Sequence, residues 1–195
     1  MKKIDNIAAD MIPTRLIISI AIIAAITLLV AFGYLNFKIS SAENSLEQEC
    51  RAIESELFSM VSSGVARDVD ELNADDGTIR SCSMSLPDNL IYLSFGVDPD
   101  SDNDGVLETG LTINGSVMFY KVEGGSKKAV WLDEDFKFRE GLFYGGKWII
   151  NGAGQGYILQ GGGKSSLIFE LVKKSNESFV LIHSNDHIEL SLIHI

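Results

Sequence analysis

An uncharged apolar run from Leu16 to Leu35 constrains this chain more than any other stretch. A helix rises about 1.5 Å per residue, so about 20 apolar residues cross the ~30 Å hydrocarbon core of a bilayer. The run has this length and contains no Asp, Glu, Lys or Arg. It predicts a transmembrane helix over 16–35, preceded by a tail (1–15) and followed by the larger part of the chain.

Basic residues around this run predict its orientation. Lys2, Lys3 and Arg15 precede the run, whereas the other flank carries Lys38 as its one basic residue up to position 50. Lys and Arg near a span prefer the cytoplasm. We expect a single-pass protein of the cell membrane with a cytoplasmic N-terminus and an extracytoplasmic C-terminal domain. A cleaved signal peptide is the alternative, but the run is longer than a usual signal core, so we expect an uncut anchor.

The helical pattern continues beyond the span. Apolar side chains recur along one stripe, namely Ile39, Ala42, Leu46, Cys50, Ile53, Leu57 and Met60. No proline or glycine interrupts this pattern before Gly64. It predicts an amphipathic stalk helix over 36–65, continuous with the span. The stripe either packs on the protein's own domain or forms a coiled-coil seam with neighbouring copies.

After Gly64 the period changes to short apolar or alternating runs separated by turns rich in Gly, Asp and Asn. The expected strands are 79–86, 89–97, 116–122, 129–132, 136–144, 148–151, 157–160, 166–172 and 179–183. Many short strands with regular turns are typical of a sandwich or curled sheet. We therefore expect an α+β fold: a long N-terminal helix, transmembrane and then amphipathic, followed by an antiparallel β-sandwich or curled-sheet domain over 66–189.

Charge narrows the range of partners. The chain has 27 acidic and 16 basic residues and a formal net charge of -11. A nucleic-acid-binding protein needs a basic face, so we expect no nucleic-acid partner. The lipid bilayer is the partner that the span predicts.

An acidic stretch between two expected strands carries the clearest chemical pattern. It reads D-x-D-x-D-G from Asp100, and such spacing lets alternate carboxylates turn inward around one ion, with a glycine at the sharp bend. The candidate calcium ligands are Asp100, Asp102, Asp104, the carbonyl of Val106, and Glu108. The stretch resembles the short calcium loops of extracellular modules more than a full EF-hand, because its twelfth position is Leu111. A solvated acidic loop is the alternative, and a bound calcium would have a structural role.

The two cysteines are Cys50, in the expected stalk helix, and Cys82, in the first expected strand. Both follow the span, so an oxidising compartment would let them form a disulfide that closes a loop of about thirty residues and stabilises the fold by ~3 kcal/mol. Two buried free thiols are the alternative.

The last six residues (190–195) read LSLIHI. This peptide is what a transposon end sequence used in sequencing libraries encodes in one frame, so we interpret it as an adaptor artefact and leave it out of the fold. A genuine final strand is the alternative.

The layout of short basic tail, span, amphipathic helix and β domain resembles that of type IV pilins and pseudopilins, and in detail that of archaeal pilin-like membrane proteins. The matching parts are 16–65 and the strand-rich region after Ile79. The resemblance implies partners among other pilin-like or cell-surface proteins, including further copies of this chain. It departs at the processing site, because residues 11–15 lack the Gly or Ala of a prepilin cleavage point and 16–20 contain no acid.

These observations favour a membrane-anchored extracytoplasmic structural or interaction protein, pilin-like and uncut, acting as an accessory of a cell-surface or pilus-type assembly. The alternative is an anchored ligand- or calcium-binding ectodomain, a sensor or adhesin. No Ser/His/Asp or Cys/His set can be assembled from the sequence, so we expect no enzyme and no cofactor other than calcium.

Overall fold

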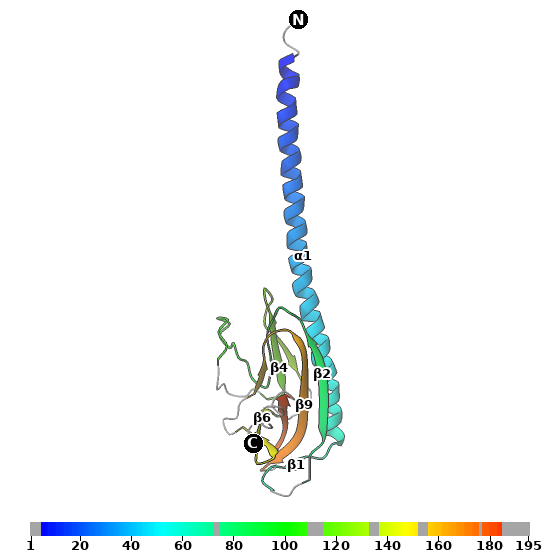
Figure 1. The fold of residues 1–195 in the computed structure, drawn as a ribbon, viewed down its shortest axis with the longest axis vertical. Helices are drawn as coiled ribbons and strands as arrows, with labels where there is room; N and C mark the ends of the chain where they lie inside the picture. The colour runs from blue at the N-terminus through cyan, green and yellow to red at the C-terminus, as the bar shows by residue number, and fades with distance from the viewer. Residues whose placement is uncertain are drawn as a thin grey trace, which may run out of the picture. The chain divides into compact units, whose positions relative to one another are not determined.

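The computed structural model describes residues 5–71, 75–108, 115–132, 137–151, 156–175 and 177–184, with side chains described from residue 14 onwards. Figure 1 shows one long helix followed by strands. The elements are α1 (Asp5–Ser63), β1 (Arg67–Asp68), β2 (Ile79–Leu86), β3 (Leu90–Phe95), β4 (Val117–Val122), β5 (Lys128–Trp131), β6 (Lys137–Tyr144), β7 (Lys147–Ile150), β8 (Tyr157–Leu159), β9 (Gly163–Lys174) and β10 (Glu177–Ser184). The α+β class and all nine expected strands are confirmed. The two-residue β1 is an addition, and 190–195 lies outside the described residues.

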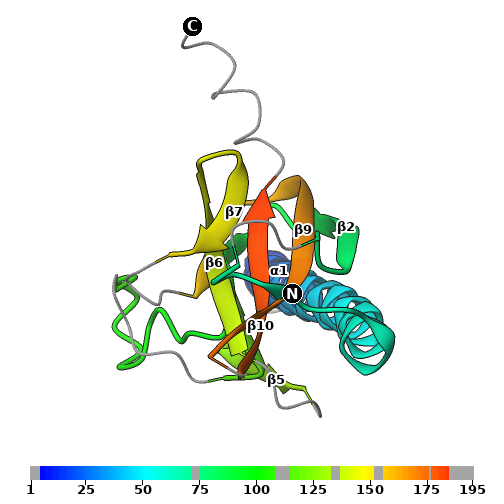
Figure 2. The same cartoon turned by 90° about the horizontal axis from the view of Figure 1, so that it is seen from below.

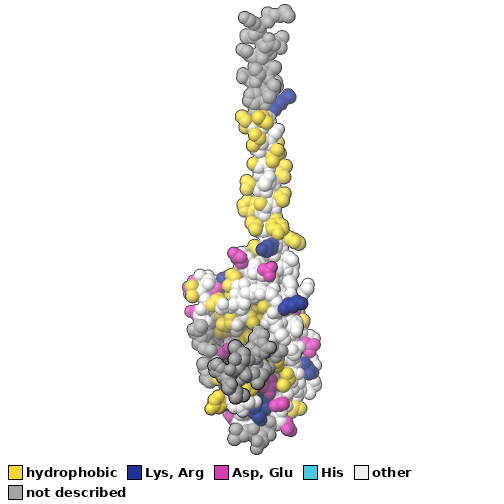
Figure 3. Space-filling view, viewed as in Figure 1, with side chains coloured by type: hydrophobic (Ala, Val, Ile, Leu, Met, Phe, Trp, Pro, Cys, Tyr) yellow, Lys and Arg dark blue, Asp and Glu magenta, His cyan; other side chains and the backbone are white. Residues whose placement is uncertain are grey.

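The chain divides into two compact units, Met1–Ser41 and Ala42–Ile195. In the first unit, the large apolar side chains from Leu16 to Phe37 are 53% to 72% exposed. Figure 3 shows these hydrophobic side chains covering the helix surface in yellow. Among the described residues, this is one helix long and apolar enough to cross a membrane, judged by length and composition. It is consistent with a membrane anchor or a signal sequence.

Two polar side chains within this apolar segment are satisfied by the helix itself. The Ser19 hydroxyl donates to the Arg15 carbonyl at 3.0 Å, and the Thr27 hydroxyl donates to the Ile23 carbonyl at 2.9 Å. Such bonds to the preceding turn leave neither of these two hydroxyls unpaired in an apolar solvent. Ser19 and Thr27 are therefore compatible with a hydrocarbon environment.

In the second unit, α1 packs its apolar stripe onto the strands. Ala42, Leu46, Cys50, Ile53, Leu57 and Met60 are all buried, and each is at most 7% exposed. The helix lies along β2, where Glu49 accepts a hydrogen bond from the Ser85 backbone N–H at 3.1 Å. The stripe thus packs on the protein's own domain. The alternative of a coiled-coil seam with neighbouring copies is excluded for these six residues, because they are already covered.

The helix ends two residues earlier than its pattern predicts. Gly64 donates its N–H to the Met60 carbonyl at 2.9 Å and closes the last turn. Val65 then exchanges bonds with Thr78, whose hydroxyl accepts from the Val65 N–H at 2.8 Å. A side chain at position 64 would collide with Met60 and Thr78, so glycine is required at this stop.

The larger sheet has six strands in the order β1-β9-β10-β6-β7, with β2 also paired to β9. Figure 2 shows β7, β6, β10, β9 and β2 following one another across this sheet. Most pairs are antiparallel, as expected, but β1 with β9 and β6 with β10 are parallel. β6 also changes partner along its length: residues 137–140 pair with β10, and 141–144 pair with β7.

The buried Arg67 links the two ends of this curled sheet. Arg67 of β1 donates two hydrogen bonds to Glu170 of β9, and both side chains are at most 5% exposed. The same guanidinium donates to the Trp148 carbonyl of β7 at 2.7 Å. Because β1 and β7 are the ends of the strand order, the sheet curls far enough for its ends to share one side chain. The expectation of a curled sheet is confirmed.

The second sheet is wholly antiparallel, in the order β5-β4-β3-β8. It packs on the larger sheet through Phe95 of β3, whose ring lies edge-on to Phe138 of β6 at 5.5 Å and to Phe169 of β9 at 5.9 Å. All three rings are fully buried. The opposite face of β3 and β4 carries Tyr92, Val117 and Phe119, and this face supports the acidic loop.

Candidate functional site

The acidic loop, whose described part runs from Asp98 to Glu108, follows β3. It folds back over the outer face of the second sheet, the face that carries Tyr92, Val117 and Phe119. Leu107, near the end of its described part, packs against the cluster of Tyr92, Val117 and Phe119. The Glu108 backbone N–H donates to the Pro99 carbonyl at 2.7 Å and closes the loop. The loop is therefore held by apolar contact on one side and by its own backbone on the other.

Carboxylates shape the loop by accepting backbone N–H groups a few residues ahead. Asp102 accepts from the Asp104 N–H at 3.2 Å, and Asp104 accepts from the Val106 N–H at 2.7 Å. Asp100 accepts from the Gly105 N–H at 3.0 Å, and Gly105 has φ of +85°, which glycine adopts without strain. Short acidic side chains favour such turns because each replaces a backbone hydrogen bond.

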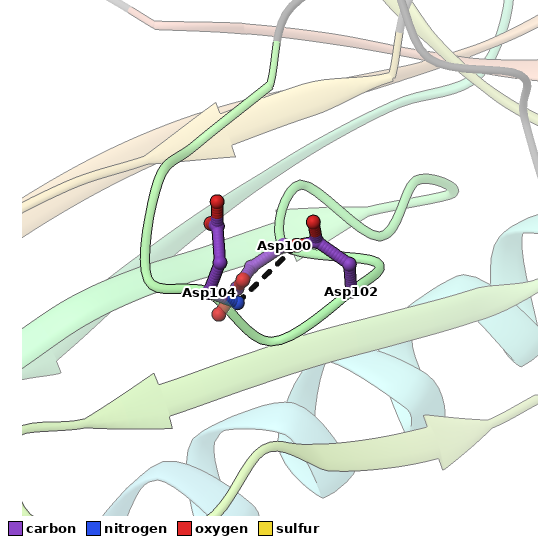
Figure 4. A group of neighbouring side chains, drawn as sticks. All are labelled: Asp100, Asp102 and Asp104. Carbon is purple, nitrogen blue, oxygen red and sulfur yellow. Dashed lines mark hydrogen bonds between the residues drawn. The ribbon is translucent and has the colours of Figure 1, made fainter.

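Three of the predicted ligands come together. One carboxylate oxygen from each of Asp100, Asp102 and Asp104 lies within 4.8 Å of the others, and Figure 4 shows the three side chains on one turn of the loop. Asp100 is buried, whereas Asp102 and Asp104 are exposed. Carboxylate oxygens are the ligands that hard cations such as Ca²⁺ prefer, so this group could bind a metal ion.

The other two predicted ligands are placed differently. Glu108 accepts a hydrogen bond from the Ser101 hydroxyl at 3.1 Å and is not part of the group of three acids. Val106 has an exposed side chain, and its N–H is used by Asp104. The structure therefore brings together the first three ligands of the predicted set and leaves Glu108 bonded across the loop.

Two lysines from the β4–β5 hairpin neutralise the start of the loop. Lys121 donates to Asp100 at 2.7 Å, and Lys127 donates to Asp98 at 2.7 Å and to the Asp100 carbonyl at 2.8 Å. The hydrogen bond from Lys121, and then that from Gly105, lower the pKa of Asp100. Sequence reasoning missed both lysines. They flank the Gly124–Gly125 turn, and nothing in their spacing reveals which loop they face.

Tyr92 is a second residue that the sequence did not single out. It is fully buried beneath this loop, and its hydroxyl has no hydrogen-bond partner in the described part of the chain. Burial raises the pKa of the Tyr92 hydroxyl, and the negative charges of Asp98 and Asp100 raise it further. The hydroxyl is therefore close enough to Asp98 and Asp100 to interact with their charges.

The two cysteines are free thiols in the structure. Cys50 is buried in α1, where burial and then Glu49 raise its pKa to about 12. Cys82 is half-buried in β2, and its pKa is raised by burial and then by Glu56. Neither thiol is activated as a nucleophile, because the thiolate is the reactive form and both environments disfavour it. The disulfide between them stays a prediction.

Comparison of the chain with protein-family models, with curated proteins and with solved structures gives no match. The site is therefore defined by its own geometry: three gathered carboxylates, two lysines and a buried tyrosine on the outer face of the second sheet.

Proposed function

We propose that this protein is a membrane-anchored, extracytoplasmic structural or interaction protein, a pilin-like accessory of a cell-surface or pilus-type assembly. The observation that carries the proposal is the apolar segment from Leu16 to Phe37, whose large side chains are all more than half exposed. Leaving so much apolar area in water is unfavourable by roughly 25 cal/mol per Å², so a bilayer or other apolar helices cover it. The proposal assigns no reaction to the chain.

The helix supports a display role through the different surroundings of its two parts. From Ala42 onwards, its stripe is buried on the β domain, so those residues are used inside the protein. The span remains as the apolar surface available to lipid and to neighbouring helices. With three basic residues before the span and Lys38 after it, the proposed orientation has the N-terminus in the cytoplasm.

Membrane anchoring is tested with a matched pair of lysine substitutions in the full chain. Ile23→Lys places a charge in the middle of the span, which costs about 2.5–3.5 kcal/mol on insertion, whereas Gln48→Lys changes an exposed position on the same helix. We expect the wild type and Gln48→Lys to stay in membranes after carbonate washing, and a smaller fraction of Ile23→Lys to be recovered there. Release of the wild type, or a mature chain that mass spectrometry shows to begin after the span, would overturn the anchor.

The assembly part of the proposal needs its own test. Amine or photo-reactive cross-linking of intact membranes should give species larger than the monomer, whose partners are then identified by mass spectrometry. Recovery of monomer alone would refute a role in an assembly while leaving the anchor intact.

We also propose a second function, an anchored calcium-binding ectodomain, because Asp100, Asp102 and Asp104 gather their oxygens within 4.8 Å. Calcium there would have a structural role and would fix the loop over the second sheet. The test is thermal unfolding of the full chain in detergent micelles, with calcium and with a chelator. Calcium should raise the melting temperature, and the shift should keep growing with calcium concentration after the site is filled, because the stabilisation is RT ln(1 + c/Kd) at calcium concentration c. Equal melting temperatures would rule this function out.

A further inference from the structure

The first acid of the D-x-D-x-D-G loop is already engaged by a cation of the protein itself. Asp100 is fully buried, and one of its oxygens accepts from the Gly105 N–H at 3.0 Å. The other accepts from the Lys121 ammonium at 2.7 Å, and the Lys121 side chain is only 17% exposed. A charge-assisted bond this short and this protected is among the stronger hydrogen bonds in proteins.

A second feature indicates that this loop has a further occupant. Tyr92 stands directly opposite Lys121 in the β3–β4 register, so both side chains project from the same face of the sheet. Leu107 of the loop covers that face. The Tyr92 hydroxyl is buried there without a partner in the described part of the chain. A buried unpaired hydroxyl costs about 1–3 kcal/mol and is ordinarily explained by a bound water or ion.

We propose that Lys121 is an internal competitor for the metal site: its ammonium occupies Asp100 in the ion-free loop, and a divalent cation must displace it to bind Asp100, Asp102 and Asp104. The inference rests on the calcium-binding function proposed above. A Ca²⁺ ion sits about 2.3–2.6 Å from its ligand oxygens. With the ammonium 2.7 Å from Asp100, the two cations would lie within a few ångströms of each other in a shielded site, where their repulsion is strong.

The competition determines which ions the site accepts. A monovalent cation gains no charge by replacing a lysine, whereas a divalent cation adds one positive charge next to two further carboxylates. The site therefore selects divalent ions and binds them more weakly than its carboxylates alone would allow.

Lys121→Met tests the competition, because it removes the charge and keeps the length of the side chain. Calcium binding to the full chain in detergent micelles is measured by calorimetry. The matched control is Lys128→Met, since Lys128 lies on the same hairpin but pairs with Glu43 at 3.8 Å. We expect Lys121→Met to bind calcium about 10- to 100-fold more tightly than the wild type, the range that loss of one competing charge-assisted bond gives. Lys128→Met should stay within about twofold of the wild type.

A measurement on the unchanged protein makes the test independent of folding. Amine acetylation of the wild type, read by mass spectrometry, should label Lys121 faster with calcium than with chelator, while Lys128 is labelled equally in both. Two results would overturn the competition but not the metal site. The first is a folded Lys121→Met that binds calcium no more tightly than the wild type. The second is calcium binding to the wild type without any change in the labelling of Lys121. Absence of calcium binding in the wild type and in both variants would refute the metal site, and the competition with it.

Discussion

His183 makes the stability of the β domain depend on pH. The residue lies in β10, is 4% exposed, and has an Nδ1 atom without a hydrogen-bond partner among the described residues. Its ring stacks on the Trp148 indole with centroids 3.7 Å apart and planes 9° apart. Burial lowers the pKa of His183 from 6.5 to about 4. The imidazole is therefore neutral in the folded protein at pH values where an unfolded histidine is already charged.

The size of the effect follows from the difference between the two pKa values. Above pH 6.5 neither state binds the proton, so His183 contributes nothing to the pH dependence. Below pH 6.5 the unfolded chain binds a proton that the folded chain does not, and the free energy of unfolding falls until about pH 4, where both states are protonated. At about 1.36 kcal/mol per pKa unit, the total loss is about 3 kcal/mol.

The matched variant is His183→Phe, which keeps an aromatic ring against Trp148 and removes the titration. Denaturant unfolding of the full chain in detergent micelles, followed by tryptophan fluorescence between pH 7 and pH 4, gives the free energy for each protein. Acids that titrate in both proteins cancel in the difference, so the wild type should lose about 3 kcal/mol more than the variant over this range. Parallel curves for the two proteins would refute the reasoning.

Three further predictions concern stability measured in the same way. Arg67→Met should destabilise the fold by about 3–5 kcal/mol, because it leaves Glu170 charged and buried, and adding Glu170→Met should restore much of the loss; a double variant no better than the single one would contradict this. Leu46→Ala should cost about 2–5 kcal/mol, whereas Gln48→Ala on the exposed face should stay within about 0.5 kcal/mol, and equal effects would mean that the helix does not pack as described. Tyr92→Phe should leave stability in chelator unchanged or raise it by up to about 1–3 kcal/mol, because it removes a buried hydroxyl without a partner among the described residues; a loss of stability would reveal a bond that the structure lacks.

Local sequence patterns predicted the elements of this fold well. The apolar stripe and the absence of proline and glycine between Gly33 and Gly64 predicted that the stalk continues the helix of the span, and α1 runs without interruption from Asp5 to Ser63. Alternation and Gly- or Asn-rich turns predicted nine strands. Both signals are local, because they depend on the 3.6-residue period of a helix and the two-residue period of a strand.

Pairing between distant strands could not be predicted in the same way. The parallel contact of β6 with β10 joins residues about 40 positions apart, and nothing in either strand specifies the other. The two-residue β1 carries no periodic signal, yet it places Arg67 where Glu170 and Trp148 meet. Such contacts depend on the curl of the whole sheet.

The candidate site shows the same division. The spacing of Asp100, Asp102 and Asp104 predicted that their carboxylates would gather, because a tight loop brings alternate residues to one side. Lys121 lies in β4, distant in sequence from the loop, and its contact with Asp100 depends on how the loop lies across the sheet. The sequence therefore predicted the acids of the site but not the base that faces them.

The change of partner within β6 divides the six-stranded sheet into parts whose backbone amides are protected from solvent exchange to different extents. β7 pairs only with residues 141–144 of β6, beyond the point where β6 leaves β10, whereas β9 and β10 pair along eight residue positions. Opening of the β6–β7 hairpin needs the loss of one short ladder, the His183–Trp148 stack, the Arg67 bond and the packing of Trp148 and Ile150 on the β9–β10 cluster, and leaves the rest of the sheet paired. Backbone amides of Lys147–Ile150 should therefore exchange with solvent deuterium through local opening, well before those of β9 and β10. Acid favours open states in which His183 is hydrated and protonated, so it should speed exchange in this hairpin first.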